Sequence, residues 1–413
     1  MGKFKSWCTD NKVASWDSSP VEIATDLPQG NGLVARAPIS KGSCILEIPR
    51  PLMMSIANSS QLNAELKSLI DQDQLISRTP PLCLALFLLD HKLNQKEASF
   101  WAPYINILPR TFDIPLYWDP PHFATLRKSL SLTTYRQSVG IIVNTALQYC
   151  HVFSILSRLG AAAPFALEHF TWTNFRWAIS VVLTRQNELP SVSSPSLSQT
   201  AAPVALIPFW DMCNHDTGEM TSFYNVETDR LESSAIRDYC PGEQVFMFYG
   251  PRPNSQLLLF SGFVHPDNPY DHLTIQLSAD EISRHLSYEK ETIIHLLGLS
   301  LSQLTLRSLG RLDDDAVTLV RILAASPEDL QFIGVDPHRS HKRISVDNEQ
   351  RAVEIFHQLL LPLSVAKDLL AVSDPILSQI RIFLQEEEKI IQDTRDQLSS
   401  ISAALQEVSS PQE

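Results

Sequence analysis

Residues 207–215 read Ile207-Pro208-Phe209-Trp210-Asp211-Met212-Cys213-Asn214-His215, and this run of aromatic and polar side chains guides the interpretation of the whole chain. Three further segments share that density: Thr184-Arg185-Gln186-Asn187, Phe248-Tyr249-Gly250-Pro251-Arg252-Pro253-Asn254 and Ser261-Gly262-Phe263. Taken singly, Asp211, Asn214 and His215 can cap a turn, because short polar side chains bond to nearby backbone. Trp210 and Tyr249 can equally be core aromatics with satisfied polar tips. The residues alone therefore leave a structural and a functional interpretation open.

Pattern rules exclude several common chemistries. The sequence has no GxxxxGK[ST] phosphate loop, no HExxH zinc motif and no GxSxG nucleophile motif. Its six cysteines are scattered without a CxxC pair, so neither a zinc site nor a disulfide framework is expected. Cys213 and His215 lack a second pair of ligands, and we predict that the protein binds no metal. Reduced thiols point to the cytoplasm or the nucleus.

Length, composition and charge describe a globular chain of two domains. The chain has 413 residues, 44% of them hydrophobic and 19% charged, and this length exceeds what one hydrophobic core usually serves. Its net charge of −13 argues against nucleic acid or an anionic membrane as partner, since both attract positive surfaces. The densest apolar run, 80–89, is too short to span a bilayer. We expect a monomer with no nucleic-acid partner and no stable membrane association.

Periodicity divides the chain into strand-rich and helical parts. Patterns that predict strands occur in four places: 20–60, 204–207, 221–226 and 244–249. Residues 60–185 predict a helical insert, and a Ser/Pro/Ala-rich loop follows at 191–203. From about 279 the pattern is helical, so the best domain boundary lies near 275. Two serines are expected to cap helices of this tail: Ser345 and Ser373.

Together, the motifs resemble a SET domain. The turn Asn214-His215 followed by Phe248-Tyr249-Gly250, with an early Gly-x-Gly-Leu strand and a helical insert between, carries this likeness. The segments 100–105 and 115–117 and the helical tail resemble the Rubisco-methyltransferase-like branch of SET proteins. More narrowly, three segments resemble the actin-histidine N-methyltransferases: 184–187, 207–215 and 249–254.

The resemblance implies an α+β fold and a cofactor. A SET-domain β-fold with its helical insert (about 60–185) would occupy residues 1–275, and an all-helical substrate-binding domain would occupy 276–413. The turn at Asn214 and the Tyr249 segment would meet at a knot-like crossing, which is rare in proteins. The cofactor would be S-adenosyl-L-methionine, and the reaction would methylate the tele nitrogen of a histidine of actin.

The same likeness assigns roles to individual residues. The cofactor would be bound by Gln29, Asn31, Arg185, Asp211, Asn214, His215, Tyr249, Ser261 and Phe263. The substrate would be bound by Asn187, Trp210, Tyr249 and Arg252, with Tyr249 and Asn187 as the catalytic pair. Gly30 and Gly32 would form a turn that lets the backbone approach the cofactor closely. Gln29 and Asn31 depart from the acidic and aromatic residues that the family has there.

The acceptor determines what Asn187 must do. Imidazole, with a pKa of about 6.5, largely offers a lone pair near neutrality, whereas lysine, at about 10.4, must first lose a proton. An amide that donates and accepts hydrogen bonds can hold the ring in the reactive orientation. Two alternatives stay open: a lysine methyltransferase acting on another protein, and a non-catalytic SET-fold binding module. Asn187 argues against the former, and the intact Asn214, His215 and Tyr249 argue against the latter.

Overall fold

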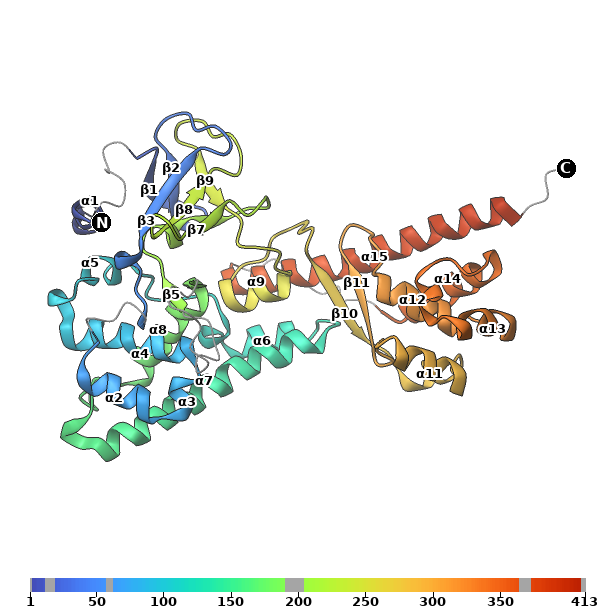
Figure 1. The fold of residues 1–413 in the computed structure, drawn as a ribbon, viewed down its shortest axis with the longest axis horizontal. Helices are drawn as coiled ribbons and strands as arrows, with labels where there is room; N and C mark the ends of the chain where they lie inside the picture. The colour runs from blue at the N-terminus through green and yellow to red at the C-terminus, as the bar shows by residue number, and fades with distance from the viewer. Residues whose placement is uncertain (1, 12–18, 57–61, 190–203, 364–372, 410–413) are drawn as a thin grey trace. The chain divides into compact units, whose positions relative to one another are not determined.

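The computed structural model describes residues 2–11, 19–56, 62–189, 204–363 and 373–409 (Figure 1). Two compact units result: unit 1 comprises Met1–Tyr117 with Gly140–Gly250, and unit 2 comprises Trp118–Val139 with Pro251–Glu413. These compact units differ from the domains expected from the sequence, because residues 118–139 of the expected insert and residues 251–275 belong to unit 2. The domain boundary near 275 itself stays a prediction, and the loop predicted at 191–203 lies outside the described residues.

The strands of unit 1 form small separate sheets. One sheet has the order β1 (Val21–Leu27), β2 (Gly30–Ala35), β9 (Gln244–Met247) and β6 (Asn214–His215). Another has the order β3 (Cys44–Pro49), β8 (Arg230–Ser234) and β7 (Ser222–Asn225), while β4 (Gln186–Glu188) pairs with β5 (Val204–Leu206). Strand β6 runs parallel to β9, with Asn214 opposite Phe246 and His215 opposite Met247. The strands predicted around 204–207, 221–226 and 244–249 are thereby confirmed.

The predicted helical insert is confirmed. Unit 1 contains α1 (Gly2–Asp10), α2 (Ala64–Gln72), α3 (Gln74–Ser77), α4 (Pro80–Asp90), α5 (Ala102–Ile105) and α8 (Trp172–Arg185). Irregular turns join them: η1 (Arg50–Leu52), the π-helical η3 (His91–Gln95), η4 (Lys96–Ala98), η5 (Pro115–Tyr117), η6 (Gly160–Ala162) and η7 (Trp210–Met212). Helix α8 begins where Thr171 accepts a hydrogen bond from the backbone N–H of Asn174, as expected of an N-cap.

Helix α7 (Leu132–Leu159) begins in unit 2 and ends in unit 1. Within the described residues, the segment Leu132–Ala162 is long and apolar enough to cross a bilayer by length and composition. Core helices of globular proteins meet the same criterion, so it does not by itself identify a membrane protein.

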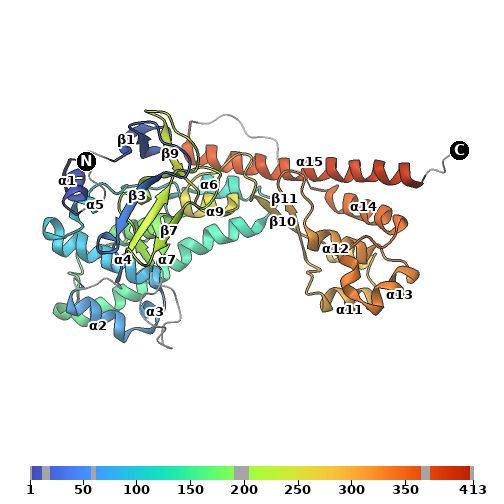
Figure 2. The same cartoon turned by 45° about the horizontal axis from the view of Figure 1, so that its top comes forward.

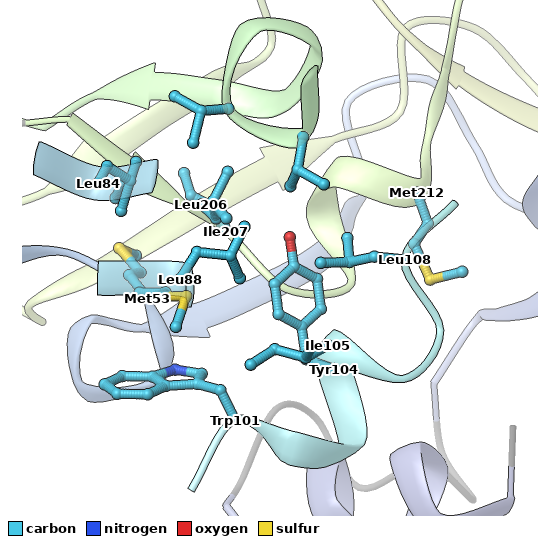
Figure 3. Packing of buried hydrophobic residues seen from close by; sticks show 14 of the residues in the cluster. Met53, Leu84, Leu88, Trp101, Tyr104, Ile105, Leu108, Leu206, Ile207 and Met212 are labelled. Carbon is cyan, nitrogen blue, oxygen red and sulfur yellow. The ribbon is translucent and has the colours of Figure 1, made fainter. Parts of the chain in front are cut away.

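The core of unit 1 joins the insert to the strands. Figure 3 shows Leu84 and Leu88 of α4 near Leu206 of β5, with Trp101 and Tyr104 beside them. Helix α4 is buried from Leu82 to Asp90, which explains its uniformly apolar sequence. The indole N–H of Trp101 donates to Leu52 O at 2.9 Å, so this large ring is buried without an unsatisfied donor.

Unit 2 is mostly helical and has its own core. It contains α6 (Pro120–Leu126), α9 (Asn254–Ser261), β10 (His272–Gln276), α10 (Ala279–Ser283), α11 (Tyr288–Leu296), β11 (Gln303–Arg307), α12 (Asp314–Leu323), α13 (Pro327–Val335), η8 (Pro337–His341), α14 (Val346–Leu360) and α15 (Pro375–Ser409). Figure 2 shows α14 beside the long α15, and residues of the two helices are in contact.

Two local expectations for the tail need correction. The helical pattern expected from 279 is interrupted by β11, where Leu304 and Leu306 are buried in alternation and the strand pairs antiparallel with β10. Ser345 caps α14 as predicted. Ser373 is not the cap of α15, because the side chain of Asp374 accepts the hydrogen bond from Leu377 N at 3.0 Å. A carboxylate satisfies the first free N–H groups and also favours the positive end of the helix.

Candidate functional site

The parallel pairing of β6 with β9 positions Tyr249. Just beyond β9, the backbone N–H of Tyr249 donates to Nδ1 of His215 at 3.1 Å, and the two ring centroids lie 5.0 Å apart. The Tyr249 hydroxyl donates to Cys213 O at 2.8 Å. The residue is therefore anchored by both its backbone and its hydroxyl to the segment 213–215, as the predicted crossing requires.

The glycine-rich segment serves this crossing differently from the prediction. Residues 30–32 open strand β2, and the turn occupies positions 28 and 29. The Nδ2 atom of Asn214 donates to Asn31 O at 3.2 Å. A Cβ atom at Gly32 would lie 2.8 Å from Asn214 Nδ2, which real side chains essentially never do. Gly32 is thus needed for close approach of Asn214, and Gln29 and Asn31 remain exposed beside it.

A buried charge pair lies at the end of α8. Arg185 Nη1 lies 3.4 Å from Asp211 Oδ2 and donates to Asp211 O at 2.5 Å. Although burial opposes a charged guanidinium, Asp211 raises the pKa of Arg185, so Arg185 stays protonated. The Asp211 side chain is 2% exposed, and such a charge is tolerated in the interior only when it is paired.

Tyr104 completes this pair and was not among the predicted site residues. Its hydroxyl donates to Asp211 Oδ2 at 2.5 Å. Burial, and then the Asp211 charge, raise the pKa of Tyr104 well above its usual value, so the hydroxyl remains a proton donor. Figure 3 shows the Tyr104 ring rising from α5 into the core. A single tyrosine in an apolar segment gives no sequence signal for this role.

The backbone just before Trp210 is strained. Phe209 is fully buried and has a φ of +73°, a region that costs a non-glycine residue on the order of 1–3 kcal/mol. The aromatic ring of Phe4 holds it in place, with its centroid 6.5 Å from that of Phe209 and 6.4 Å from that of Tyr104. Helix α1 therefore supports both Tyr104 and the turn that presents Trp210 and Asp211.

Two predicted substrate residues lie half-buried on neighbouring elements. Trp210 donates its indole N–H to Ser222 Oγ at 3.1 Å, which fixes the plane of the ring. Asn187 lies in β4 opposite Ala205 and donates from Nδ2 to Arg185 O at 3.0 Å. Within the described residues, no hydrogen bond reaches Asn187 Oδ1, so this side chain offers an acceptor.

The remaining predicted residues belong to unit 2. Ser261 is the last residue of α9, Gly262 follows in the left-handed conformation, and Phe263 N donates to Leu257 O. Arg252 precedes α9 and accepts, through its backbone oxygen, a hydrogen bond from Asn268 Nδ2 at 2.8 Å. The structure thus brings Arg185, Asp211, Asn214, His215 and Tyr249 together in unit 1. The binding and catalytic roles of all the predicted site residues, Ser261, Phe263 and Arg252 included, stay predictions.

The site has one hydrogen-bond donor and one acceptor that could each bind a ligand. Within the described residues, Arg185 Nε and Asp211 Oδ1 are buried without a hydrogen-bond partner, which is uncommon for buried polar atoms. The part of the chain that the structure describes contains no group of three or more His, Cys, Asp or Glu side chains that could hold a metal ion.

Comparison with known proteins identifies the family. The SET domain family matches residues 30–250. The chain is 31% identical over 346 residues to the actin-histidine N-methyltransferase of Gallus gallus, covering 83% of this chain and 56% of that protein. It is 34% identical over 288 residues to the actin-histidine N-methyltransferase of Papio anubis, covering 70% of this chain and 46% of that protein. The chain therefore spans about half the length of these relatives.

Solved structures share the fold. The SET domain of LSMT bound to lysine and AdoHcy superimposes with a TM-score of 0.67 at 20% identity, covering 98% of this chain and 92% of that one. Rubisco LSMT bound to AdoMet gives a TM-score of 0.63 at 20% identity, covering 98% and 93%. At this identity the likeness concerns the fold.

Proposed function

Because the chain belongs to the SET-domain family, we propose that it is an S-adenosyl-L-methionine-dependent protein-histidine N-methyltransferase that acts on the tele nitrogen of a histidine of actin. The single observation that supports histidine as the methyl acceptor is the orientation of Asn187, whose Nδ2 donates to Arg185 O and leaves Oδ1 as a hydrogen-bond acceptor. The names of the curated relatives support actin as the substrate. Cytoplasmic or nuclear location and a monomeric state stay predictions.

The residues present fit the cofactor. When bound, S-adenosyl-L-methionine supplies an electrophilic methyl group. Its amino-acid end needs both donors and acceptors, and Arg185 Nε and Asp211 Oδ1 have unused capacity of both kinds. Asn214, held by Asn31 O, and His215 would border the same ligand. We assign Gln29, Ser261 and Phe263 to this set on the resemblance alone.

Asn187 would select the tautomer of the acceptor ring. Its Oδ1 can accept a hydrogen bond from the imidazole nitrogen that carries the proton. The other nitrogen then has a free lone pair, and near neutrality most imidazole is uncharged. Orientation rather than deprotonation would therefore supply much of the rate.

Tyr249 and Trp210 would form the walls of the reaction channel. The Tyr249 hydroxyl donates its proton to Cys213 O, so its oxygen and ring face direct electron density at a positively polarised methyl group. Trp210, fixed by Ser222 Oγ, would stack on a flat acceptor ring. Arg252 would bind the peptide, as the resemblance implies.

Transfer of a labelled methyl group to actin tests the proposal. The purified chain with labelled cofactor should methylate an actin peptide that contains the target histidine, and mass spectrometry should locate the product on the tele nitrogen. The matched control peptide has alanine in place of that histidine, and equal incorporation into both would refute a histidine acceptor. Tyr249→Phe should lower the rate at least 100-fold, as loss of a group acting in the transition state does.

A lysine acceptor is the second candidate, because the structural relatives are described as bound to lysine or monomethyllysine. Asn187→Phe should shift preference from histidine toward lysine by filling the position of the amide. The ratio of rates on matched histidine and lysine peptides decides this, and an unchanged ratio would argue against the role of Asn187. Absence of transfer together with absence of cofactor binding would favour a non-catalytic binding module.

A further inference from the structure

A cavity of about 590 Å³ in unit 1 lies apart from the residues assigned above and has a positive lining. Residues of η3, α5 and α8 and the segment around Arg110 form its walls. Four cationic side chains line it, Lys92, Lys96, Arg110 and Arg176, against one carboxylate, that of Glu97. In a chain whose net charge is −13, this is a local reversal of sign.

Aromatic faces hold these cations in place. Lys92 Nζ lies 3.2 Å from the centroid of the Trp177 ring, and Arg176 Cζ lies 4.3 Å from that of Tyr117. Within the described ranges, Lys92, Arg110 and Arg176 make no ion pair with a carboxylate. An aromatic face orients a cation without cancelling its charge, so the cavity keeps its positive potential.

The walls are fixed by hydrogen bonds. The indole N–H of Trp177 donates to Pro109 O at 2.8 Å, and Arg176 Nη1 donates to Leu116 O at 3.4 Å. Lys92 lies in the π-helical turn η3, an irregularity that is frequent at functional sites. Both Lys92 and Arg176 are thereby held in a preformed arrangement.

Burial and a neighbouring cation both disfavour the charged form of Lys92. Burial, with a contribution from Arg110, lowers the pKa of Lys92 to about 8. The other groups lining the cavity offer little compensation: Glu97 forms its ion pair with the exposed Lys3 at 3.5 Å. A bound anion would relieve this repulsion.

We propose that this cavity binds a small polyanion of the phosphate class, such as a diphosphate or a phosphate ester. Two guanidinium groups and an ammonium match the several oxygens of such a ligand. The volume is that of a typical small-molecule site. This activity is independent of methyl transfer.

Titration calorimetry with inorganic pyrophosphate at constant ionic strength tests the proposal on the full chain. We expect binding, and Arg110→Ala should weaken it at least tenfold. Arg110 is exposed, so this variant should fold. Lys67→Ala removes the same charge from an exposed position on α2 and should bind as the wild type does. Equal affinity of the Arg110 variant, or no binding, would overturn the proposal.

Competition measurements distinguish free phosphate, phosphorylated amino acids and acidic peptides as ligands of the cavity. Inorganic phosphate and phosphoserine should compete with pyrophosphate, whereas a glutamate-rich peptide should not. A cavity that bound only the peptide would be a protein-docking surface, and the proposal would be wrong. At pH 8, binding should take up protons through Lys92, so the observed enthalpy should depend on the buffer. Lys92→Met should remove the share of that dependence that comes from the lysine and leave the share that comes from the protonation of pyrophosphate itself. A dependence equal to that of the wild type would contradict the assignment.

Discussion

Two arginines of α8 show contrasting ways to place a cation inside a protein. Arg185, at the end of the helix, has a carboxylate partner in Asp211 and a supporting hydroxyl from Tyr104. Arg176, on the same helix, lies over the ring of Tyr117 and has no carboxylate partner within the described residues. Both are fixed in position, but only the charge of Arg185 is neutralised.

This difference separates positioning from recognition. Because Arg185 and Asp211 neutralise each other and are hydrogen-bonded, the free-energy cost of burying their charges is small. The pair also makes the segment around Asp211 rigid. An unneutralised cluster keeps a positive potential and is completed by an anion from outside. Substitutions at the two places should therefore affect different properties, stability at the first and ligand affinity at the second.

The largest effect should come from breaking the neutralised pair. Asp211→Ala leaves the partly buried Arg185, whose side chain is 21% exposed, without its carboxylate, and we expect a loss of about 3 kcal/mol in the free energy of unfolding. Urea titration measures it. Glu219→Ala is the matched control, because that carboxylate is exposed and lies 4.0 Å from Lys41. Equal free energies of unfolding for the two variants would show that the Arg185–Asp211 pair stabilises the fold no more than an exposed ion pair does.

In unit 2 the buried carboxyl group of Glu387 is accommodated in a third way, by hydrogen bonds and a raised pKa. Glu387 accepts hydrogen bonds from Ser129 Oγ at 2.7 Å and Leu130 N at 3.1 Å, and burial raises its pKa from 4.5 to about 7. Between pH 4.5 and about pH 7 the carboxyl of Glu387 is therefore protonated in the folded state and ionised in the unfolded state. The free energy of unfolding should consequently fall as the pH rises through this range. The contribution is on the order of 3 kcal/mol.

Unfolding at pH 5 and pH 8 checks this effect. Glu387→Gln should reduce the difference in unfolding free energy between the two conditions, since glutamine does not ionise. Glu388→Gln, one residue along the same helix, is the control and should keep the wild-type difference. A Glu387 variant with unchanged pH dependence would show that the carboxylate is charged in the folded protein at low cost.

Removing the hydroxyl that supports the pair should have a smaller effect. Tyr104→Phe leaves Asp211 Oδ2 with only Arg185 Nη1, 3.4 Å away, as a partner, and we expect a loss of about 1–2 kcal/mol in stability. If Tyr104 positions Asp211 for the cofactor, calorimetry should also detect weaker binding of S-adenosyl-L-methionine. Tyr288→Phe is the control and should change neither quantity, because Tyr288 is 82% exposed. Weaker stability with unchanged cofactor affinity would limit Tyr104 to a structural role.

The smallest effect should come from the unneutralised cluster. Lys92→Met keeps a flexible side chain of similar length but removes the cation, so the cation–π attraction to Trp177 is lost while repulsion by Arg110 is relieved. The stability of the ligand-free protein should change by less than about 1 kcal/mol. Thermal unfolding without phosphate measures it. A loss as large as that of Asp211→Ala would mean that Lys92 holds the fold together.

Local patterns predicted much of the architecture. The strand-rich part, the helical insert and the cap at Ser345 follow from periodicity and from short-range hydrogen bonding, which depend on neighbouring residues. The crossing that brings His215 to Tyr249 followed from the resemblance, because two compact motifs carry it. In each case the relevant residues lie within one segment or one recognised motif.

The features that were missed depend on distant partners. Tyr104 matters only because Asp211, 107 residues later, accepts its hydrogen bond. The cation cluster likewise joins Lys92 of η3, Arg110 of a loop and Arg176 of α8. Strand β11 was hidden in a helical tail because five residues are too few to establish a period of two against a helical background.

The order of strands β1, β2, β9 and β6 has a consequence for how the protein is made. Strand β2 pairs with β9 through Leu33 and Val245, so the first sheet cannot be completed until the ribosome has released residues near 247. Closing so long a loop is entropically costly and slow. Nascent β1 and β2 therefore keep an unpaired strand edge until β9 has been synthesised.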